Sequence, residues 1–585
     1  MSRSLLILYG SETGCAQDVA ENLARQARRR RFYAKTMAMD DYDKAKLIEE
    51  KLVIFVCSTT GQGAEPTNMR QFWKFLLRKN LPKDILSDID CAVLGLGDSS
   101  YRKFNYPSKK LYKRLIQLGA NMLIDRGDCD DQHYLGLDGA FVPWAKQLWD
   151  VVMEKYPTDQ PIISDDVLLP PNYKITFLAE DAQYTNRPYQ KLPGEVDLIV
   201  KENKRITAED HFQDVRHIQL VCDKDSSDLS YQPGDIAVIR PQNLSTEVDA
   251  FLEFMGWTEH ADKLIQVTTT DQHQLLPSHW PTSMRFKDLF IYHLDVFGVP
   301  RRSFFEMLSY FTPDQNLKER LQEFASPQGQ EDMWNYCMRP RRHVAEILFD
   351  FTPLDIPLDY IIDLFPLLQP RSFSIASSLD AHPNAMELCV AVVKYKTKLK
   401  RVRRGVFTKW LSTWKSGDLI QSIRIERGTM TLPPTPEIPL IAISPGTGVA
   451  PMRSFIENRV AQGAKRNVLL FGCRYPDKDY YYKEQWETYE EQNQLSVWTA
   501  FSRQDPNRKF YVQDRIREHA DEIWDLIEYQ QAKVVLSGSL DKMPEDVAYA
   551  FKQVFMQQGG LDAEEAENYY RDMIKTGQYQ EECWN

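Results

Sequence analysis

Both ends of this 585-residue chain alternate between short apolar runs and amphipathic segments. In the N-terminal part the apolar runs cover residues 5–10, 52–59, 91–98 and 121–128, and segments with helical periodicity separate them. Towards the C-terminus the runs PLIAIS, NVLLFGCR, LSVWTAF and KVVLSGS repeat the pattern. Such alternation predicts parallel sheets that are covered by helices on both faces. We therefore expect an α/β domain at each end, with ligands beyond the carboxyl ends of the strands.

The middle of the chain differs from its ends. Residues 156–171 contain four prolines and two adjacent acids, which predicts a linker after a first domain at 1–155. Short β-rich runs within 172–432 predict an antiparallel barrel. Helical periodicity at about 245–350 predicts an insert in that barrel, and 433–585 is the last domain. The β-rich runs are 173–179, 195–207, 215–222, 236–243 and 387–397.

Composition excludes several classes of function. The chain has 83 acidic and 72 basic residues and a net charge of −11, which argues against a nucleic-acid partner. Its nine cysteines are scattered without a CxxC pair, so we expect no metal site and reduced thiols in the cytoplasm. The apolar run at the N-terminus is short and is followed by a loop, so we expect no signal peptide. Because no apolar run approaches about 18 residues, we also expect no membrane anchor.

Three loops of the first domain have the composition of a phosphate site. The first, residues 11–16, joins a strand to a helix, where backbone N–H groups and the helix dipole favour an anion. An ordinary capped turn is the alternative, since Ser and Thr cap helices well. The loops at 58–63 and 96–101 follow at the same predicted sheet edge, and Tyr101 is a candidate stacking ring or a half-buried aromatic. Asp131 belongs to a run of acids that could contact a ligand or simply be solvated.

A second site is predicted in the barrel. Arg371, Ser372, Phe373 and Ser374 offer a cation, a flat ring and hydroxyls within four residues. The alternative is a plain barrel strand, although a buried Arg needs an anionic partner. The turn from Gly405 through Val406 and Phe407 to Thr408 would bind a further phosphate, and the basic run before it could be only a solvated hairpin.

A third site is predicted in the last domain. Gly446 and Thr447 belong to a glycine-rich loop directly after an apolar strand, where a pyrophosphate binds in dinucleotide folds. About 55 residues later comes a cluster of hydroxyls and cations. Because these groups would neutralise a 2′-phosphate, they favour the phosphorylated dinucleotide over NAD. The cluster consists of Ser502, Arg503, Lys509 and Tyr511.

The chain ends in ECWN, and Trp584 is costly to leave in water. We expect its ring to cover a flat group. A frayed tail is the alternative, because chain ends are often disordered.

The motifs, taken in chain order, resemble those of the diflavin reductases. They are SETG, LGLGDSSYRKFN, RSFSIASS, GVFT, PGTGVAPM, AFSR, KFYVQ and the terminal Trp, and the resemblance covers essentially the whole chain. It implies a flavodoxin-like FMN domain, an antiparallel FAD-binding barrel with a helical connecting insert, and a ferredoxin-reductase-like NADPH-binding αβ domain.

The resemblance also implies which residues hold each cofactor. FMN would be held by Ser11, Glu12, Thr13, Gly14, Cys15, Ala16, Ser58, Thr59, Thr60, Gly61, Leu96, Gly97, Asp98, Tyr101, Phe104, Asn105 and Asp131. FAD would be held by Arg371, Ser372, Phe373, Ser374, Cys389, Ala391, Gly405, Val406, Phe407, Thr408 and Trp584. NADPH would be held by Gly446, Thr447, Ser502, Arg503, Lys509, Tyr511 and Gln513.

Four residues are expected near the transferred hydride, namely Ser374, Ser537, Glu582 and Trp584. Many relatives carry a cysteine and an aspartate where this chain has Ser537 and Glu582, so we expect slower hydride transfer. An aromatic residue of the microsomal monooxygenase reductase is replaced by Thr60, which leaves Tyr101 to stack on one face of FMN.

The implied function is electron transfer from NADPH to FAD, then to FMN and to an external one-electron acceptor. The stretch 206–220 and the ECWN ending resemble the branch that serves cytosolic iron–sulfur assembly, whose acceptor is an anamorsin-type iron–sulfur protein. The linker would let the FMN domain swing between FAD and that acceptor. The alternatives are a soluble reductase for a haem monooxygenase, sulfite reductase or methionine synthase, and a flavin-bearing regulatory scaffold.

Overall fold

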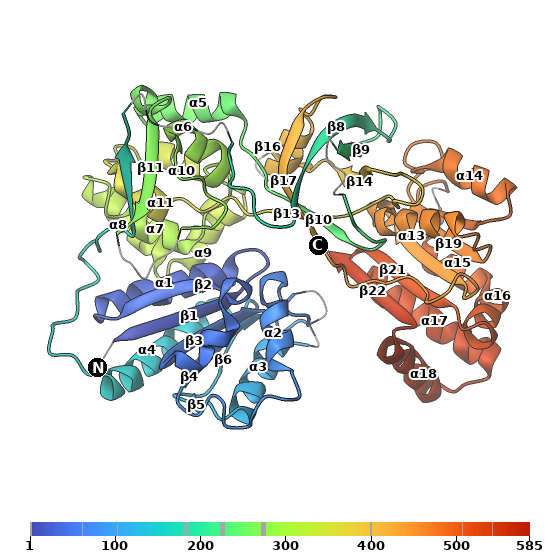
Figure 1. Ribbon diagram of the computed structural model, residues 1–585, viewed down its shortest axis with the longest axis horizontal. Helices are drawn as coiled ribbons and strands as arrows, with labels where there is room; N and C mark the ends of the chain where they lie inside the picture. The colour runs from blue at the N-terminus through green and yellow to red at the C-terminus, as the bar shows by residue number, and fades with distance from the viewer. Residues whose placement is uncertain are drawn as a thin grey trace. The chain divides into compact units, whose positions relative to one another are not determined.

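The computed structural model describes the chain except for residues 1–2, 61–62, 102, 180–181, 183, 185–186, 223–228, 271–275, 398–399, 506, 541 and 585. The chain forms two compact units, and it crosses between them several times (Figure 1). The first unit comprises Met1–Pro188, Asn243–Gln369 and Thr397–Lys400, and the second comprises Tyr189–Gln242, Pro370–Lys396 and Arg401–Asn585. In the described part of the chain, no helix has both the length and the apolar character needed to cross a membrane.

The N-terminal part of the first unit is a parallel sheet in the order β2-β1-β3-β4-β5, with β6 also paired to β4. The strands are β1 (Ser4–Gly10), β2 (Tyr33–Ala38), β3 (Leu52–Ser58), β4 (Asp90–Gly97), β5 (Asn121–Met122) and β6 (Gly127–Asp130). The single strand expected at 121–128 is therefore two short strands. This 2-1-3-4-5 order is that of the flavodoxin-like fold, whose ligand lies where the order reverses between β1 and β3.

Helices cover both faces of this sheet because each has one apolar side (Figure 1). Helices α1 (Cys15–Arg29) and α4 (Asp138–Lys155) contribute to one apolar core, and α2 (Arg70–Leu76) and α3 (Tyr106–Gln117) contribute to the other.

The predicted linker runs along the C-terminal end of α1, and four consecutive arginines stand at that end. Arg28 donates to the carbonyl of Pro170 at 2.6 Å, Arg29 to that of Val167 at 2.9 Å and Arg31 to that of Pro161 at 3.0 Å. The N–H of Ile163 donates in turn to the carbonyl of Arg29 at 2.9 Å. The segment has no helix or strand, yet its backbone is held against the first domain at several points.

The remainder of the first unit is helical and has its own apolar core. Its longer helices are α5 (Ser245–Phe254), α7 (Arg302–Leu308), α8 (Gln315–Ala325) and α10 (Val344–Asp350). Strand β7 (Tyr173–Phe177), which we expected in the barrel, instead pairs with β11 (Leu264–Thr269) in a three-stranded sheet beside these helices. Alternation within a short apolar strand cannot tell which partner strand it will find.

The second unit contains the barrel, an antiparallel sheet in the order β13-β10-β17-β8-β9-β14. A bridge between Ile375 and Leu388 joins the end of β13 to β14, which nearly closes the sheet. The strands are β8 (Glu195–Arg205), β9 (Val215–Cys222), β10 (Ile236–Ile239), β13 (Arg371–Ser374), β14 (Ala385–Ala391) and β17 (Leu419–Glu426).

The C-terminal part of the second unit is a parallel sheet in the order β20-β19-β18-β21-β22. Its strands are β18 (Leu440–Pro445), β19 (Asn467–Cys473), β20 (Ser496–Phe501), β21 (Lys533–Ser539) and β22 (Tyr579–Trp584). Counted from β18 the order is 3-2-1-4-5, that of a dinucleotide-binding fold whose strand order reverses between β18 and β21.

Candidate functional site: three nucleotide-binding edges

The loop after β1 adopts the conformation that its glycine predicts. Gly14 has φ 87°, a left-handed conformation that costs glycine little. The hydroxyl of Ser11 accepts from the N–H of Ala16 in the first turn of helix α1 at 3.2 Å, while the N-cap residue of that helix is Gly14. The carboxylate of Glu12 accepts from the N–H of Thr67 at 2.8 Å and organises a neighbouring loop. Thr13, which is exposed, and Cys15, which is half-buried, complete the turn.

The loops after β3, β4 and β6 meet at the same sheet edge. The N–H of Thr59 donates to the carbonyl of Leu96, and that of Asp131 to the carbonyl of Gly97, both at 2.9 Å. Ser58 donates to the carbonyl of Gly10 at 3.2 Å, and Thr60 pairs with Ala64 in a short bridge. The structure thus brings the predicted FMN residues together, except Gly61, which lies outside the described residues.

Two polar atoms at this edge lack a hydrogen-bond partner among the described residues. Both Thr59 Oγ1 and Asn105 Oδ1 are buried, whereas the Asn105 amide nitrogen donates to the carbonyl of Cys129 at 3.1 Å. Buried acceptors and hydroxyls are normally satisfied, so these atoms fit the edge of a bound polar ring. Tyr101 is 39% exposed, as a ring waiting for a flat partner would be.

Acidic side chains line the rim of this edge. Burial alone would raise the pKa of Asp98. Hydrogen bonds from Ser100 and Gln132 outweigh burial and hold this pKa below its ordinary value. Burial, followed by the charges of Asp98 and Asp130, raises the pKa of Asp131. Phe104 is half-buried nearby, and Lys109 Nζ lies 5.0 Å from the centroid of its ring.

In the barrel the structure brings β13 and the turn at 405–408 together. The rings of Phe373 and Phe407 lie 4.6 Å apart between centroids. The N–H of Val393 donates to Thr408 Oγ1 at 3.0 Å, and the N–H of Gly405 donates to the carbonyl of Val393 at 3.1 Å. Arg371 and Ser374 are half-buried and Ser372 is exposed on β13, while Cys389 and Ala391 lie on β14 and Val406 begins α12 (Val406–Leu411). Cations, hydroxyls and paired aromatic rings form a donor set that fits a flavin dinucleotide.

In the glycine-rich loop after β18, Gly448 packs closely against the backbone of β21, whereas Gly446 faces open space. Gly446 has φ 59° and no atom within 4 Å of the position a Cβ would take. At Gly448 a Cβ would stand 2.0 Å from the carbonyl oxygen of Ser537, so only glycine fits there. The half-buried Thr447 lies between them, and helix α13 (Val449–Ala461) follows. The close approach and the open face fit a cradle for a pyrophosphate.

The cluster after β20 lies at the same carboxyl edge of the sheet, and β19 separates β20 from β18. The N–H of Ser502 donates to the carbonyl of Cys473 at 2.9 Å, and that of Arg503 to the carbonyl of Arg474 at 3.0 Å. Arg503 and Lys509 are exposed, and Tyr511 is the residue before helix α15 (Val512–Glu518). The side chain of Gln513 instead donates to Asp546 at 3.4 Å.

A small pocket opens beside this cluster, and its two phenylalanines belong to the AFSR and KFYVQ motifs. It is lined by Phe501, Gln504, Asp505, Arg508, Phe510, Arg515 and Glu518. The sequence signal for this pocket was that Phe501 and Phe510 flank the predicted cations, since a flat base needs apolar walls beside its phosphate.

The residues expected near the hydride lie on two adjacent strands, apart from Ser374 in the barrel. Ser537 of β21 and Glu582 of β22 are register partners, and Ser539 is the partner of Trp584. Ser537 is fully buried, and its hydroxyl has no partner among the described residues, while the carboxylate of Glu582 accepts from Thr429 at 2.9 Å. The described end of the chain is therefore an ordered strand rather than a frayed tail.

Comparison with known families matches each of these regions. Residues 7–144 match the flavodoxin model, 196–410 the FAD-binding domain model, and 442–548 the oxidoreductase NAD-binding domain model.

Curated relatives match the chain over its full length. NADPH-dependent diflavin oxidoreductase 1 of Danio rerio is 43% identical over 100% of this chain and 99% of its own length. The proteins of the same name from Xenopus laevis and Schizosaccharomyces pombe are 42% and 37% identical, covering 100% and 99% of this chain and 100% and 99% of their own lengths. The chain belongs to the NADPH-dependent diflavin oxidoreductases.

As a diflavin oxidoreductase the protein is an enzyme that uses FMN, FAD and NADPH. The predicted fold class, a flavodoxin-like sheet, a nearly closed antiparallel barrel and a parallel dinucleotide-binding sheet, is confirmed. Each edge has a donor set that fits the cofactor of its matched domain.

Proposed function

We propose that this diflavin oxidoreductase delivers electrons from NADPH to an anamorsin-type iron–sulfur protein in cytosolic iron–sulfur cluster assembly. The observation that carries the oxidoreductase part is the full-length match with all three domains in chain order. The acceptor is supported by the 206–220 stretch and the ECWN ending. The acidic rim at Asp98, Asp130 and Asp131 would steer a positively charged partner at low salt.

The chain's own residues have three tasks in this proposal. The loops at 11–16, 58–60 and 97–105 hold FMN, and β13 with the 405–408 turn holds FAD. The exposed cations Arg503 and Lys509 neutralise the 2′-phosphate of NADPH, while Gly446 and Gly448 let the backbone approach its pyrophosphate.

At the reacting end, Trp584 is the residue that would cover a bound flavin ring and exclude water from it. Glu582 supplies a negative charge that stabilises positive charge developing on the nicotinamide. When bound, the flavins convert a two-electron hydride donor into a source of single electrons.

The experiment is a flavin assay followed by an acceptor survey on the purified full-length protein. We expect FMN and FAD in equal amounts, and NADPH-driven reduction of an anamorsin-type protein that slows as salt rises. Faster reduction of a haem monooxygenase or of methionine synthase would refute the proposed acceptor. A colourless protein that takes up no flavin would refute the electron-transfer function itself.

A further inference from the structure

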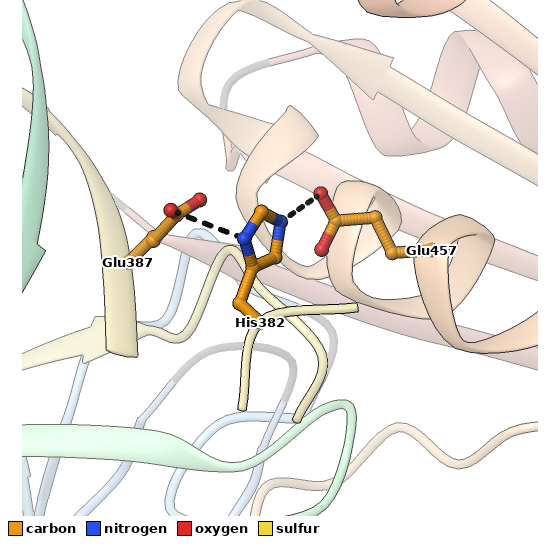
Figure 2. A group of neighbouring side chains, drawn as sticks. All are labelled: His382, Glu387 and Glu457. Carbon is orange, nitrogen blue, oxygen red and sulfur yellow. Dashed lines mark hydrogen bonds and ion pairs between the residues drawn. The ribbon is translucent and has the colours of Figure 1, made fainter. Parts of the chain in front are cut away.

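A buried group of charged side chains joins the barrel to helix α13 within the second unit. It consists of Arg453 and Glu457 of α13, Glu387 of β14 and His382 of the preceding loop, and we name these four residues the interlock. Figure 2 shows the imidazole of His382 between the carboxylates of Glu387 and Glu457. Arg453 lies 2.6 Å from the carboxylate of Glu387 and 2.8 Å from that of Glu457. Both carboxylate side chains are almost fully buried.

His382 lies between the two carboxylates. Its Nε2 is 3.1 Å from Glu457 Oε1, and its Nδ1 is 3.6 Å from Glu387 Oε1. A neutral imidazole has one N–H and one lone pair, so one ring nitrogen would face a carboxylate oxygen with no proton between them. The imidazolium presents one N–H to Glu457 at hydrogen-bond distance and the other to Glu387 at ion-pair distance. The geometry therefore favours the protonated form of His382.

Charge balance leads to the same form. The guanidinium of Arg453 neutralises one of the two glutamates, and a buried unpaired charge is costly. A protonated His382 brings the interlock to neutrality. The hydrogen bond to Glu457 raises the pKa of His382, although burial opposes it. Burial alone would raise the pKa of Glu387, but the charge of Arg453 lowers it below its ordinary value.

Other ionisable groups face the interlock from the surrounding elements. The second imidazole, His217 of β9, lies 3.9 Å from Glu387, and burial lowers its pKa, so it does not supply the missing charge. The remaining groups are Glu202, Tyr231, Asp380, Cys389, Tyr482 and Tyr489.

A divalent cation is the other occupant that an imidazole and two carboxylates accept. One ligand atom from each of His382, Glu387 and Glu457 lies within 4.8 Å of the others. However, Arg453 already binds both carboxylates, so a metal ion would sit beside a guanidinium. With a proton on His382, the two positive and two negative charges of the interlock already balance, so no cation is needed for neutrality.

The interlock connects the two predicted nucleotide edges of this unit. Helix α13 starts directly after the glycine-rich loop, and the loop that carries His382 follows β13. Ser454 donates to the carbonyl of Ser377 at 2.6 Å, and the N–H of Ser378 donates to Glu457 at 3.0 Å. The interlock thus lies beside the hydrogen bonds that join helix α13 to the segment after β13.

We propose that protonated His382 is a positioning residue for hydride transfer, which fastens α13 to the barrel and so sets the nicotinamide against the flavin ring. The proposal rests on the assignment of NADPH and FAD to these two edges. When His382 loses its proton, a net negative charge remains buried and the attachment of α13 loosens.

The direction of the pH dependence follows. The pKa of His382 is raised in the folded protein, so its contribution to stability is complete below the ordinary imidazole pKa of about 6.5. That contribution is lost as pH rises through the folded-state pKa. Hydride transfer should therefore slow towards alkaline pH.

The test compares the flavin-loaded protein with its His382→Gln variant across about pH 6 to pH 9. Flavin bleaching by NADPH in a stopped-flow instrument should be about tenfold slower in the variant at the acidic end, with little change in the KM for NADPH, and the two proteins should converge at the alkaline end. The difference in Tm should shrink in the same direction. His260→Gln, in the other unit, is the matched control and should keep the wild-type profile.

Several outcomes would overturn the proposal. A rate or Tm deficit that is the same at every pH would mean that the imidazole only fills space. A rise in wild-type Tm with added Zn²⁺ that His382→Gln abolishes would make the group a metal site.

If His382→Gln does not fold, Glu457→Gln should move the alkaline loss of rate to lower pH, and an unmoved profile would refute the proposal. The Tm comparison tests the interlock without any hydride transfer. Failure of NADPH to reduce the wild-type protein would therefore refute only the assignment of NADPH and FAD to these edges.

Discussion

Arg503 and Lys509 expose two cations on the loop that follows β20, and no described carboxylate forms an ion pair with Arg503 within 4.0 Å. Other cations nearby are engaged, for example Arg515 with Glu518 at 2.6 Å. An unengaged guanidinium at the carboxyl edge of a dinucleotide-binding sheet is suited to a phosphate monoester, because it pays no cost for breaking an existing pair.

Arg503→Ala should weaken NADPH binding about ten- to a hundredfold, the loss expected for one charged contact, and should leave NADH binding nearly unchanged. The measurement is the KM for each coenzyme with ferricyanide as acceptor. Arg517→Ala removes an arginine from the same region and is the control. Equal losses for NADPH and NADH would refute the 2′-phosphate assignment.

Trp584→Ala should improve the use of NADH, because the ring that the nicotinamide must displace is removed. The side chain ends an ordered strand and is 39% exposed, so the substitution leaves the core intact. The check is the ratio of kcat/KM for NADH to that for NADPH. Trp334→Ala, at an exposed tryptophan of the other unit, should leave this ratio unchanged.

At the scale of elements, a close backbone contact at Gly448 constrains the turn between β18 and α13. Gly448→Ala should destabilise the second unit by about 1–3 kcal/mol and abolish binding of NADP⁺, because its Cβ would overlap the backbone of Ser537. Gly463→Ala, at the end of the same helix, has open space and a left-handed φ of 79°. It should cost about 1–2 kcal/mol and keep NADP⁺ binding. Calorimetry of both variants with and without NADP⁺ separates these effects.

The elements themselves show what a sequence can predict. Strands β1, β3 and β18, which lead into the loops of Ser11, Thr59 and Gly446, were predictable, since apolar runs and turn residues are local signals. Whether Ser11 caps a helix or contacts a phosphate stayed open from the sequence, because the same residue types serve both purposes. The partner of β7 was not predictable, since pairing depends on a strand 90 residues away in the chain. Likewise His382 and Glu457 are 75 residues apart, and no periodicity relates them.

At the scale of the whole molecule, the arginines at the end of α1 determine how freely the segment 156–171 moves. Each of their bonds to the linker backbone contributes about 1 kcal/mol. The double variant Arg28→Ala with Arg31→Ala should therefore loosen the segment at Pro170 and Pro161, while Arg29 still holds its middle. We expect faster cleavage of 156–171 by a protease of broad specificity, and a changed rate of electron delivery to a protein acceptor but not to ferricyanide.

The matched control is Arg320→Ala, at an exposed arginine of α8 that bonds only to nearby acids among the described residues. Cleavage at the wild-type rate in the double variant would show that Arg28 and Arg31 do not hold the linker.

The interruption of the barrel has a consequence for how the protein is made. Strands β8, β9 and β10 leave the ribosome before the helical insert, and β13, β14 and β17 leave after it. In the finished sheet β10 lies between β13 and β17, so during the synthesis of the insert it has neither of its neighbours. Unpaired strand edges invite aggregation of nascent chains. Yield in a cell should accordingly depend on the supply of chaperones that protect growing polypeptides, even when the completed enzyme is stable.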